Sequence, residues 1–224
     1  MISHNQEKII MSLHTKKGRE KHKLCLIEGD KFIQDNQDKM QLIVSRSDFP
    51  KFNNLVTTKT PQEYLAIAPI PEWTIKDIFQ KDIVLLLDHV QDPGNIGTIL
   101  RLASAFNSSL ILLESADITS PKVLRSSVGS FFKTPWIKLK NSSLKDIQPY
   151  LNHRNIYRLE KKKASQDISQ VDIKKPLFLI VGSEGQGISV SLSGLSIYIP
   201  HTTEVESLNV ASALAITLYL FNQK

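Results

Sequence analysis

Three short segments of the chain combine turn or helix-start signals with polar side chains that could do chemistry. The first runs from Asp92 through Pro, Gly and Asn to Arg101. It places Asn95 at the start of an expected helix, and Arg101 follows about a turn and a half later near the same face. Gly97 lies between them and allows another group to approach closely. Asn95 could equally be only a helix cap and Arg101 only a surface cation, so this segment alone leaves both interpretations open.

The second segment is Gly182-Ser-Glu-Gly-Gln-Gly187, directly after an apolar run. Its glycines offer bare backbone N–H groups and room for the flat face of a ligand. The spacing matches neither the dinucleotide-binding nor the NTPase glycine pattern, which argues against both classes of site. Glu184 is the only acid in this cluster. If it is partly buried, it could act as a base or as a hydrogen-bond anchor.

The third segment lies near the C-terminus, where a short apolar strand is expected over 197–199. Pro200 ends it, because proline has no N–H to donate to a neighbouring strand. Ser207 then stands at the expected N-cap of the last helix, with Asn209 in the first turn. The helix is apolar on almost every side, so a sheet, another helix or a second subunit must cover it.

Alternating strand and helix patterns from residue 81 onward predict the sheet that brings these segments together. The continuous apolar run Ile83–Leu87 is typical of a strand buried on both faces. Further strands are expected at 110–113, 136–139, 156–159, 177–181 and 197–199, with helices at 96–106 and 121–132. The pattern predicts an α/β domain with a mostly parallel sheet and helices on both faces. Ligands of such sheets bind at the carboxyl ends of the strands, which is where the three segments lie.

The first 70 residues predict a small α+β unit with strands near 24–27, 42–44 and 65–68. Residues 1–21 form a basic amphipathic segment, which is either a solvated face or a phosphate contact. Two prolines near residue 70 interrupt regular structure. We therefore expect a substrate-binding domain at 1–70, a linker at 71–81 and a larger domain at 82–224.

The composition is that of an ordinary globular protein with an excess of positive charge. The 224 residues are 41% hydrophobic and 22% charged, with a net charge of +6. This excess favours a polyanionic partner, although a merely basic soluble protein has the same charge. The single cysteine, Cys25, excludes an intrachain disulfide and argues against a metal cluster. The chain shows neither a membrane-spanning run nor a signal peptide, so we expect a cytoplasmic protein without metal.

Taken together, the three segments resemble the motifs of the SpoU/TrmH family. The pattern Asn95-x-Gly-x-x-x-Arg101, the strand followed by Gly182-Ser-Glu-Gly, and Ile199-Pro…Ser207-Leu-Asn-Val210 match the family in order and spacing over roughly 82–222. Segment 120–129 is also similar to the family. In the first 70 residues, Lys17-Gly-Arg19, Ile27-Glu-Gly29 and Lys59-Thr-Pro-Gln62 resemble the ribosomal-protein-like RNA-binding domain of many members, here shortened between Glu28 and Lys59.

The resemblance implies an RNA ribose 2′-O-methyltransferase of the trefoil-knot (SPOUT) class that uses S-adenosyl-L-methionine (AdoMet). It implies a C-terminal knot, AdoMet bound against main chain at Gly182, Ile199 and Leu208, and a homodimer through the knot and the last helix. It also implies the set of catalytic residues, which are Asn95, Arg101, Glu184, Ser207 and Asn209. We expect Arg101 to clamp the phosphate on the 3′ side and polarise the ribose hydroxyl, because a guanidinium does not readily lose its proton.

Three other interpretations remain open at this point. Ribosomal RNA is favoured as the substrate, and tRNA is the alternative within the same activity. A non-catalytic RNA-binding or ribosome-assembly factor could use the same fold. A small-molecule α/β enzyme with another cofactor is disfavoured by the missing dinucleotide and phosphate-loop patterns and by the basic N-terminal segment.

Overall fold

The computed structural model describes residues 2–202 and 204–223, which fold as two compact units. The first consists of Met1–Glu72 and Asp117–Phe132, and the second consists of Trp73–Ala116 and Lys133–Lys224. Segment 117–132 thus belongs to the first unit although the chain on either side of it belongs to the second. The expected division at 1–70, 71–81 and 82–224 stays a prediction, because a compact unit need not be a domain that folds alone.

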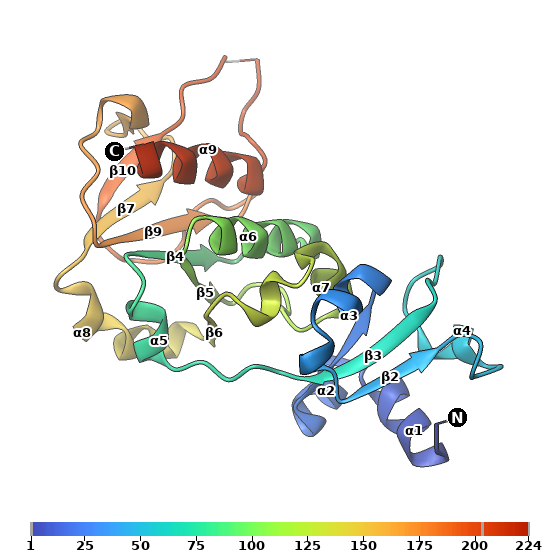
Figure 1. The fold of residues 1–224 in the computed structure, drawn as a ribbon. Coiled ribbons are helices and arrows are strands. Elements are labelled where there is room, and N and C mark those ends of the chain that lie inside the picture. Colours follow the sequence, from blue (N-terminus) through green and yellow to red (C-terminus); the bar gives the residue numbers. More distant parts are fainter. Residues whose placement is uncertain (1, 203, 224) are drawn as a thin grey trace. The chain divides into compact units, whose positions relative to one another are not determined.

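The second unit is built on a seven-stranded parallel sheet (Figure 1). In spatial order its strands are β6 (Trp136–Leu139), β5 (Ser109–Leu113), β4 (Ile83–Asp88), β9 (Leu177–Gly182), β7 (Asn155–Leu159), β10 (Leu195–Tyr198) and β8 (Gln166–Asp167). The strands predicted from apolar runs are confirmed, with small shifts at their ends. Strand β8 was missed, because two polar residues show no strand periodicity.

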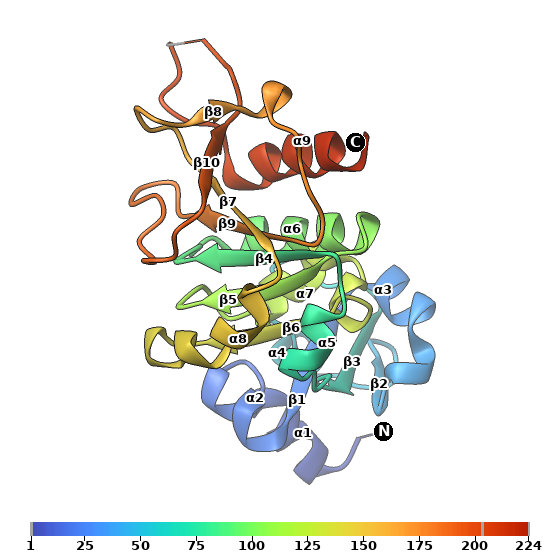
Figure 2. The ribbon, with the colours of Figure 1, turned by 90° about the vertical axis from the view of Figure 1, so that its left-hand side faces the viewer.

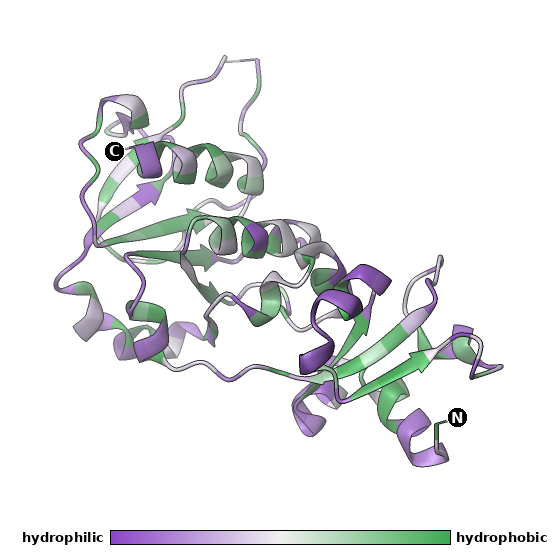
Figure 3. Cartoon of the chain, viewed as in Figure 1, coloured by the Kyte–Doolittle hydropathy of each residue, from purple (hydrophilic) through white to green (hydrophobic). Residues whose placement is uncertain are grey.

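Helices cover this sheet, as predicted. The helices α5 (Ile75–Phe79) and α8 (Gln148–Leu151) pack on one face in a cluster that contains Val84, Leu86, Ile111, Phe178 and Ile180. Because side chains alternate along a strand, Leu85 and Leu87 point to the opposite face, and both are fully buried. The helices α6 (Pro93–Ala105) and α9 (Val210–Gln223) pack against each other and contact β5 and β9 (Figure 2). The hydrophobic colouring of β4 and β9 in Figure 3 matches a strand buried on both faces.

The order of the strands places a topological switch beside β4. The chain runs outward from β4 to β5 and β6, and then returns to place β9, β7 and β10 on the other side. The register pairs Asp88 at the end of β4 with Gly182 at the end of β9. Ligands of open α/β sheets bind where the strand order reverses, at the carboxyl ends. The glycine segment therefore begins at the position that the topology favours.

The first unit carries a three-stranded antiparallel sheet in the order β1-β3-β2, which confirms the expected small α+β unit. Its strands are β1 (Leu24–Glu28), β2 (Leu42–Ser45) and β3 (Tyr64–Pro69). Its helices are α1 (His4–Ser12), α2 (Lys16–His22), α3 (Asp30–Asp35), α4 (Phe52–Leu55) and α7 (Pro121–Ser127). Cys25 is fully buried in β1, as expected, and burial raises the pKa of its thiol to about 12.

One cation of the basic N-terminal segment is structural. Arg19 is 3% exposed, and its guanidinium donates to the Asp117 carboxylate at 2.6 Å, to the Leu13 carbonyl at 2.6 Å and to the Thr119 hydroxyl at 3.2 Å. A buried, fully bonded arginine is not free to contact phosphate. The lysines that the segment leaves exposed are Lys8, Lys16, Lys17 and Lys21.

The helix expected over 121–132 is shorter than predicted. It ends at Ser127, and a 3-10 helix at Ser130–Phe132 follows. Val128 and Gly129 lie between them with φ angles of 46° and 85°. Two consecutive left-handed residues end an α-helix, and the apolar pattern that continues past them gave no sign of this.

Candidate active site

A cavity of about 350 Å³ opens at the carboxyl ends of β7, β9 and β10. The three residues predicted to bind the cofactor through main chain, Gly182, Ile199 and Leu208, all line it. Two of the predicted catalytic residues, Glu184 and Ser207, line it as well. Gly182 and Glu184 follow β9, whereas Ile199, Ser207 and Leu208 follow β10, and β7 lies between these two strands. The parallel sheet thus brings two segments that are separate in the sequence to one cavity.

The wall at Gly182 requires a residue without a side chain. Ser183 and Gly187 form a β-bridge, and the Gly187 N–H donates to the Ser183 carbonyl at 2.9 Å. A Cβ added at Gly182 would lie 2.2 Å from the carbonyl carbon of Gly187, which real Cβ atoms do not tolerate. By contrast, a Cβ added at Gly185 meets nothing within 4 Å. The close approach of the Gly187 backbone thus explains why residue 182 is a glycine. It does not explain the glycine at residue 185.

An acidic residue that sequence reasoning missed lies at the rim of this cavity. Glu160 follows β7, and its carboxylate accepts from the Arg158 Nε at 2.8 Å and the Ser196 hydroxyl at 2.7 Å, with Lys162 Nζ at 2.8 Å. Burial raises the pKa of this carboxyl, but the hydrogen bonds outweigh that effect and hold the pKa at about 2. Its place just after a parallel strand was the signal that could have drawn attention to it.

His201, a second residue that sequence reasoning missed, brings an unpaired buried atom to the same cavity. Its Nδ1 lies 2.8 Å from the Ile199 carbonyl and therefore carries the proton of that hydrogen bond. Its Nε2 is buried and has no hydrogen-bond partner among the residues the structure describes. A buried polar atom without a partner is costly, and a bound ligand with a donor group would satisfy it.

A second cavity, of about 420 Å³, lies next to the first. It is lined by residues after β4 and β9, including His89, Gln91, Asp92, Asn95 and Gly185. The two cavities share Ser183, Glu184, Gln186 and Val210 as a common wall. Ser183, Glu184 and Gln186 of the glycine segment, with Val210 at the start of α9, therefore stand between a ligand in one cavity and a ligand in the other.

Three of the predicted catalytic residues meet at this common wall. Glu184 Oε1 accepts from the Asn209 side-chain amide at 2.8 Å and from the Asn95 side-chain amide at 3.1 Å. The Asn209 amide also donates to Asn95 Oδ1 at 3.0 Å. One residue comes from each of the three sequence segments, so their contact joins the three motifs directly.

The caps of the two helices differ from the sequence predictions. Asp92, not Asn95, caps α6, since its carboxylate accepts from the Asn95 backbone N–H at 2.8 Å. The prediction that Ser207 caps the last helix was wrong, because Asn209 Oδ1 accepts from the N–H groups of Ala211 and Ser212 at 3.1 and 3.2 Å. Asn95 is thus left free to bind Glu184, while Asn209 serves both the cap and the cluster.

The two remaining predicted residues lie apart from this cluster. Ser207 lines the first cavity, two residues before the Asn209 cap. Arg101 is exposed on α6 and lines neither cavity, and among residues 2–202 and 204–223 it has no hydrogen bond or ion pair. The structure therefore joins Asn95, Glu184 and Asn209 and leaves Arg101 available to a partner.

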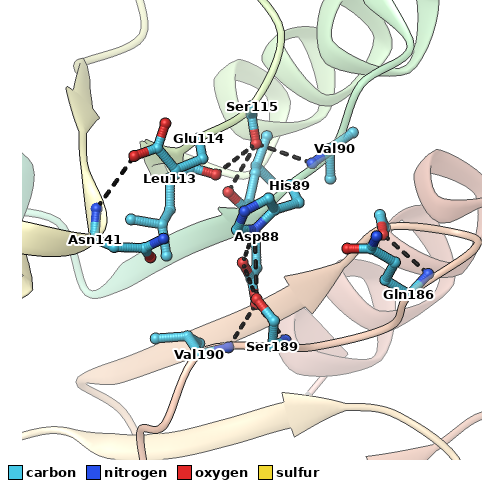
Figure 4. A network of polar contacts seen from close by, with 12 residues as sticks. Asp88, His89, Val90, Leu113, Glu114, Ser115, Asn141, Gln186, Ser189 and Val190 are labelled. Atoms are coloured by element: carbon cyan, nitrogen blue, oxygen red, sulfur yellow. Dashed lines mark hydrogen bonds and ion pairs between the residues drawn. The ribbon is translucent and has the colours of Figure 1, made fainter.

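Asp88, at the end of β4, is the centre of a network of polar contacts that includes His89, a residue that lines the second cavity (Figure 4). It is fully buried, and its carboxylate accepts from the backbone N–H groups of Ser189 and Val190 at 2.6 and 2.8 Å and contacts the Ser189 hydroxyl at 3.0 Å. His89 Nδ1 lies 2.6 Å from the same carboxylate. Burial raises the pKa of Asp88, but these hydrogen bonds, led by that from His89, bring the pKa below its ordinary value.

Comparison with known proteins identifies the family. Residues 82–219 match the model of the SpoU rRNA Methylase family. The chain belongs to this family. It is also 32% identical to the 23S rRNA (guanosine(2553)-2′-O)-methyltransferase RlmP of Bacillus subtilis, over 92% of each chain.

Solved structures of SpoU/TrmH proteins show the same fold. A TrmH-family RNA methyltransferase structure from Porphyromonas gingivalis matches with a TM-score of 0.84 and 29% identity over 100% of both chains. An AdoMet-bound rRNA methyltransferase from Sinorhizobium meliloti matches with a TM-score of 0.86 and 25% identity, over 100% of this chain and 96% of that one. The α/β fold expected for a SpoU/TrmH methyltransferase is thus confirmed, while the knot stays a prediction.

No helix between residues 2 and 223, leaving out residue 203, is long and apolar enough to cross a bilayer. In that same part of the chain, no three His, Cys, Asp or Glu side chains are grouped so that they could hold a metal ion.

Proposed function

We propose that this SpoU-family enzyme methylates a ribose 2′-hydroxyl in ribosomal RNA, with AdoMet as the methyl donor. The observation that carries the proposal is the contact of Asn95, Glu184 and Asn209 at the wall shared by two cavities. A transfer reaction needs a donor site and an acceptor site side by side. The family assignment and the likeness to RlmP and to an AdoMet-bound rRNA methyltransferase support the same activity.

The first cavity suits AdoMet. The main chain at Gly182, Ile199 and Leu208 lines this cavity and can contact the ligand directly. The unpaired Nε2 of His201 can accept a hydrogen bond from a donor group of AdoMet. Bound there, AdoMet supplies a methyl group on a positively charged sulfur, which an oxygen nucleophile can take. The Glu160 carboxylate at this cavity is already paired with Arg158 and Lys162, whereas that of Glu184 can complement a cationic ligand.

The second cavity, by this proposal, takes the ribose to be methylated. Asn95 and Glu184 stand at its wall toward the cofactor and would orient the sugar by hydrogen bonds. Glu184 binds Asn95 and Asn209 through Oε1 alone, and within the described residues Oε2 makes no hydrogen bond and can accept one from a ribose hydroxyl. Ser207 would position the reacting groups from the side of the first cavity.

Arg101, by this proposal, binds the phosphate on the 3′ side of the target and polarises the hydroxyl. Its exposure and its lack of a partner among the residues described here leave the guanidinium free to bind RNA. A planar guanidinium holds phosphate through two parallel hydrogen bonds, which an ammonium group does not. Arg101→Lys should therefore lose most of its activity although the charge is kept.

A homodimer through the knot and α9 is part of the proposal. Ile216 is 40% exposed and Tyr219 is 56% exposed, and their spacing of three residues puts them on one face of α9. Large apolar side chains that face water on a helix mark a site of association. The cytoplasmic location expected from the sequence stays a prediction.

Methyl transfer from labelled AdoMet to RNA from a strain that lacks this protein tests the activity. RNA would be separated by size, and ribose methylation would be mapped by resistance of the 2′-O-methylated linkage to alkali. We expect label in large ribosomal RNA with the wild type and none with Arg101→Ala. Label only in the tRNA fraction would keep the activity and overturn the substrate. AdoMet binding without transfer to any RNA or ribosomal particle would favour the assembly-factor interpretation.

A further inference from the structure

We propose that His89, held by the buried Asp88, takes the proton that the ribose hydroxyl loses during methyl transfer. This inference rests on the proposed function. The reaction produces one proton, and the guanidinium of Arg101 is a poor acceptor for it. An acceptor must therefore be found elsewhere in the cavity that receives the ribose.

The hydrogen bonds around Asp88 fix the tautomer of His89. The Asp88 carboxylate accepts from two backbone N–H groups and is fully buried, and these contacts keep it ionised. An ionised carboxylate only accepts hydrogen bonds, so His89 Nδ1, at 2.6 Å, must be the donor. The proton of a neutral imidazole then lies on Nδ1, and Nε2 carries a free lone pair.

The free nitrogen is accessible. The His89 side chain is 30% exposed, and the residue lines the second cavity together with Asn95 and Glu184. In the part of the chain that the structure describes, Nε2 has no hydrogen bond, whereas Nδ1 is bound to Asp88 and lies 3.4 Å from the Ser189 hydroxyl. One nitrogen is thus anchored, and the other is left for a ligand.

The backbone at His89 is strained. Its φ is +58°, in the left-handed region, and its N–H donates to the Leu113 carbonyl at 3.0 Å. The N–H of the next residue, Val90, donates to the Ser115 hydroxyl at 3.0 Å, and that hydroxyl donates back to the Leu87 carbonyl (Figure 4). Neighbouring strands therefore impose a conformation that glycine would adopt without strain. Strained residues held by surrounding structure often lie at active sites.

The charges around the imidazole suit this role. Asp88 contacts His89 directly, and the other titratable groups that line the same cavity are Asp92 and Glu184, whose carboxylates accept hydrogen bonds from Asn95. No lysine or arginine is found among the described residues that line it. The Asp88 carboxylate, in direct contact with the ring, stabilises the imidazolium that forms when Nε2 takes a proton.

The step is balanced in atoms and charge. The O–H bond of the ribose breaks, its proton passes to His89 Nε2, and its electron pair forms the new bond from oxygen to the methyl carbon. The bond between that carbon and sulfur breaks, and its electron pair stays on sulfur. A cationic sulfur and a neutral imidazole thus become a neutral thioether and an imidazolium.

His89→Gly with added imidazole tests the proposal in the full-length protein. Glycine fits a φ of +58°, so this variant can keep the backbone conformation although Asp88 loses its hydrogen bond from His89, and thermal unfolding checks that it is folded. We expect the single-turnover rate of methyl transfer to fall by about 10²- to 10⁴-fold, the usual range for one acid–base group. AdoMet and RNA affinities should stay within about twofold, and imidazole should restore the rate in proportion to its neutral form. His153→Gln, at an exposed histidine outside both cavities, is the matched control and should behave as the wild type.

Other results of these measurements would overturn the role of His89 or the proposed function, and the two cases are distinguishable. A His89→Gly rate within twofold of the wild type would overturn the proposal, and so would a lost rate that imidazole does not restore, which would make His89 a positioning residue. The tautomer is read without any activity from the ¹⁵N shifts of His89, for which we expect a protonated Nδ1 and a bare Nε2. The reverse tautomer would overturn the proposal even if no RNA substrate were found, whereas an inactive wild type with the expected tautomer would count against the proposed function alone.

Discussion

The two adjacent cavities are built in different ways. The first is shaped by close backbone approaches, as at Gly182, and its three predicted cofactor contacts are main-chain contacts. The second presents side chains that can exchange hydrogen bonds or protons, such as His89, Asp92 and Asn95. The first cavity also carries ionisable side chains, including Glu160, Lys162 and His201, but no lysine or arginine is among the described residues that line the second. Together with the contact of Asn95 and Glu184 at the shared wall, this difference supports the proposal that the first cavity takes the cofactor and the second takes the ribose.

The largest expected effect is the loss of AdoMet binding when the wall of the first cavity is altered. Gly182→Ala should abolish measurable AdoMet binding, because the new Cβ would lie 2.2 Å from the Gly187 backbone and must displace it. Isothermal calorimetry with AdoMet measures this. Gly185→Ala is the matched control, since its Cβ meets nothing within 4 Å, and it should bind AdoMet as the wild type does. Equal AdoMet affinity of both variants would contradict the assignment of AdoMet to the first cavity.

The next largest effect is a slower methyl transfer when Glu184, in the wall that the two cavities share, is replaced. Glu184→Gln keeps one acceptor oxygen for Asn95 and Asn209 but removes the negative charge, which weakens both hydrogen bonds, and turns the second acceptor, Oε2, into a donor. We expect the single-turnover rate to fall by about 10²-fold, with a smaller loss of AdoMet affinity. Rapid-quench methyl transfer at saturating AdoMet separates the two quantities. A loss confined to AdoMet affinity would assign Glu184 to the first cavity alone.

A smaller effect distinguishes two neighbouring residues of the third segment. Asn209→Ala removes the cap of α9 and should lower the free energy of unfolding by about 1 kcal/mol. Ser207→Ala should leave that free energy unchanged, because within the described part of the chain the Ser207 hydroxyl accepts no backbone N–H of α9, whose Ala211 and Ser212 N–H groups bind Asn209 Oδ1. Urea unfolding of the two variants provides the comparison. Equal losses would show that Ser207 supports the helix after all.

The smallest expected effect is a pH-dependent change in stability when Glu160 is replaced. The pKa of its carboxyl is about 2 in the folded protein, against an ordinary value of 4.5. A lowered pKa stabilises the folded state above pH 4.5, and this contribution is lost as the pH falls toward 2. The stability advantage of the wild type over Glu160→Gln should therefore shrink from pH 5 to pH 2, as followed by thermal unfolding. An advantage that does not change with pH would contradict the hydrogen bonds described for this carboxylate.

Much of the fold could be predicted from the sequence, for physical reasons that are local. The apolar runs of β4, β5 and β9 are long enough to mark buried parallel strands, and three of the five predicted catalytic residues, Asn95, Glu184 and Asn209, meet in space. The assignment of segment 117–132 to the first unit could not be predicted, because it depends on long-range contacts such as that of Arg19 with Asp117.

The errors at the site have a common origin. The sequence contains several residues that can cap a helix, and only the backbone geometry decides that Asp92 and Asn209 do so rather than Asn95 and Ser207. His89, Glu160 and His201 escaped notice because each is a single polar residue just after a strand, with no spacing pattern around it. Their roles follow from the partners that the sheet gives them, such as Asp88 for His89.

The most direct test of the central claim is a crystal structure of the protein with AdoMet bound. If the two cavities divide donor and acceptor as proposed, the density for AdoMet will lie against Gly182, Ile199 and Leu208, and the cavity of His89 and Asn95 will remain open beside its methyl group. Density for AdoMet against His89 and Asn95 would contradict the account.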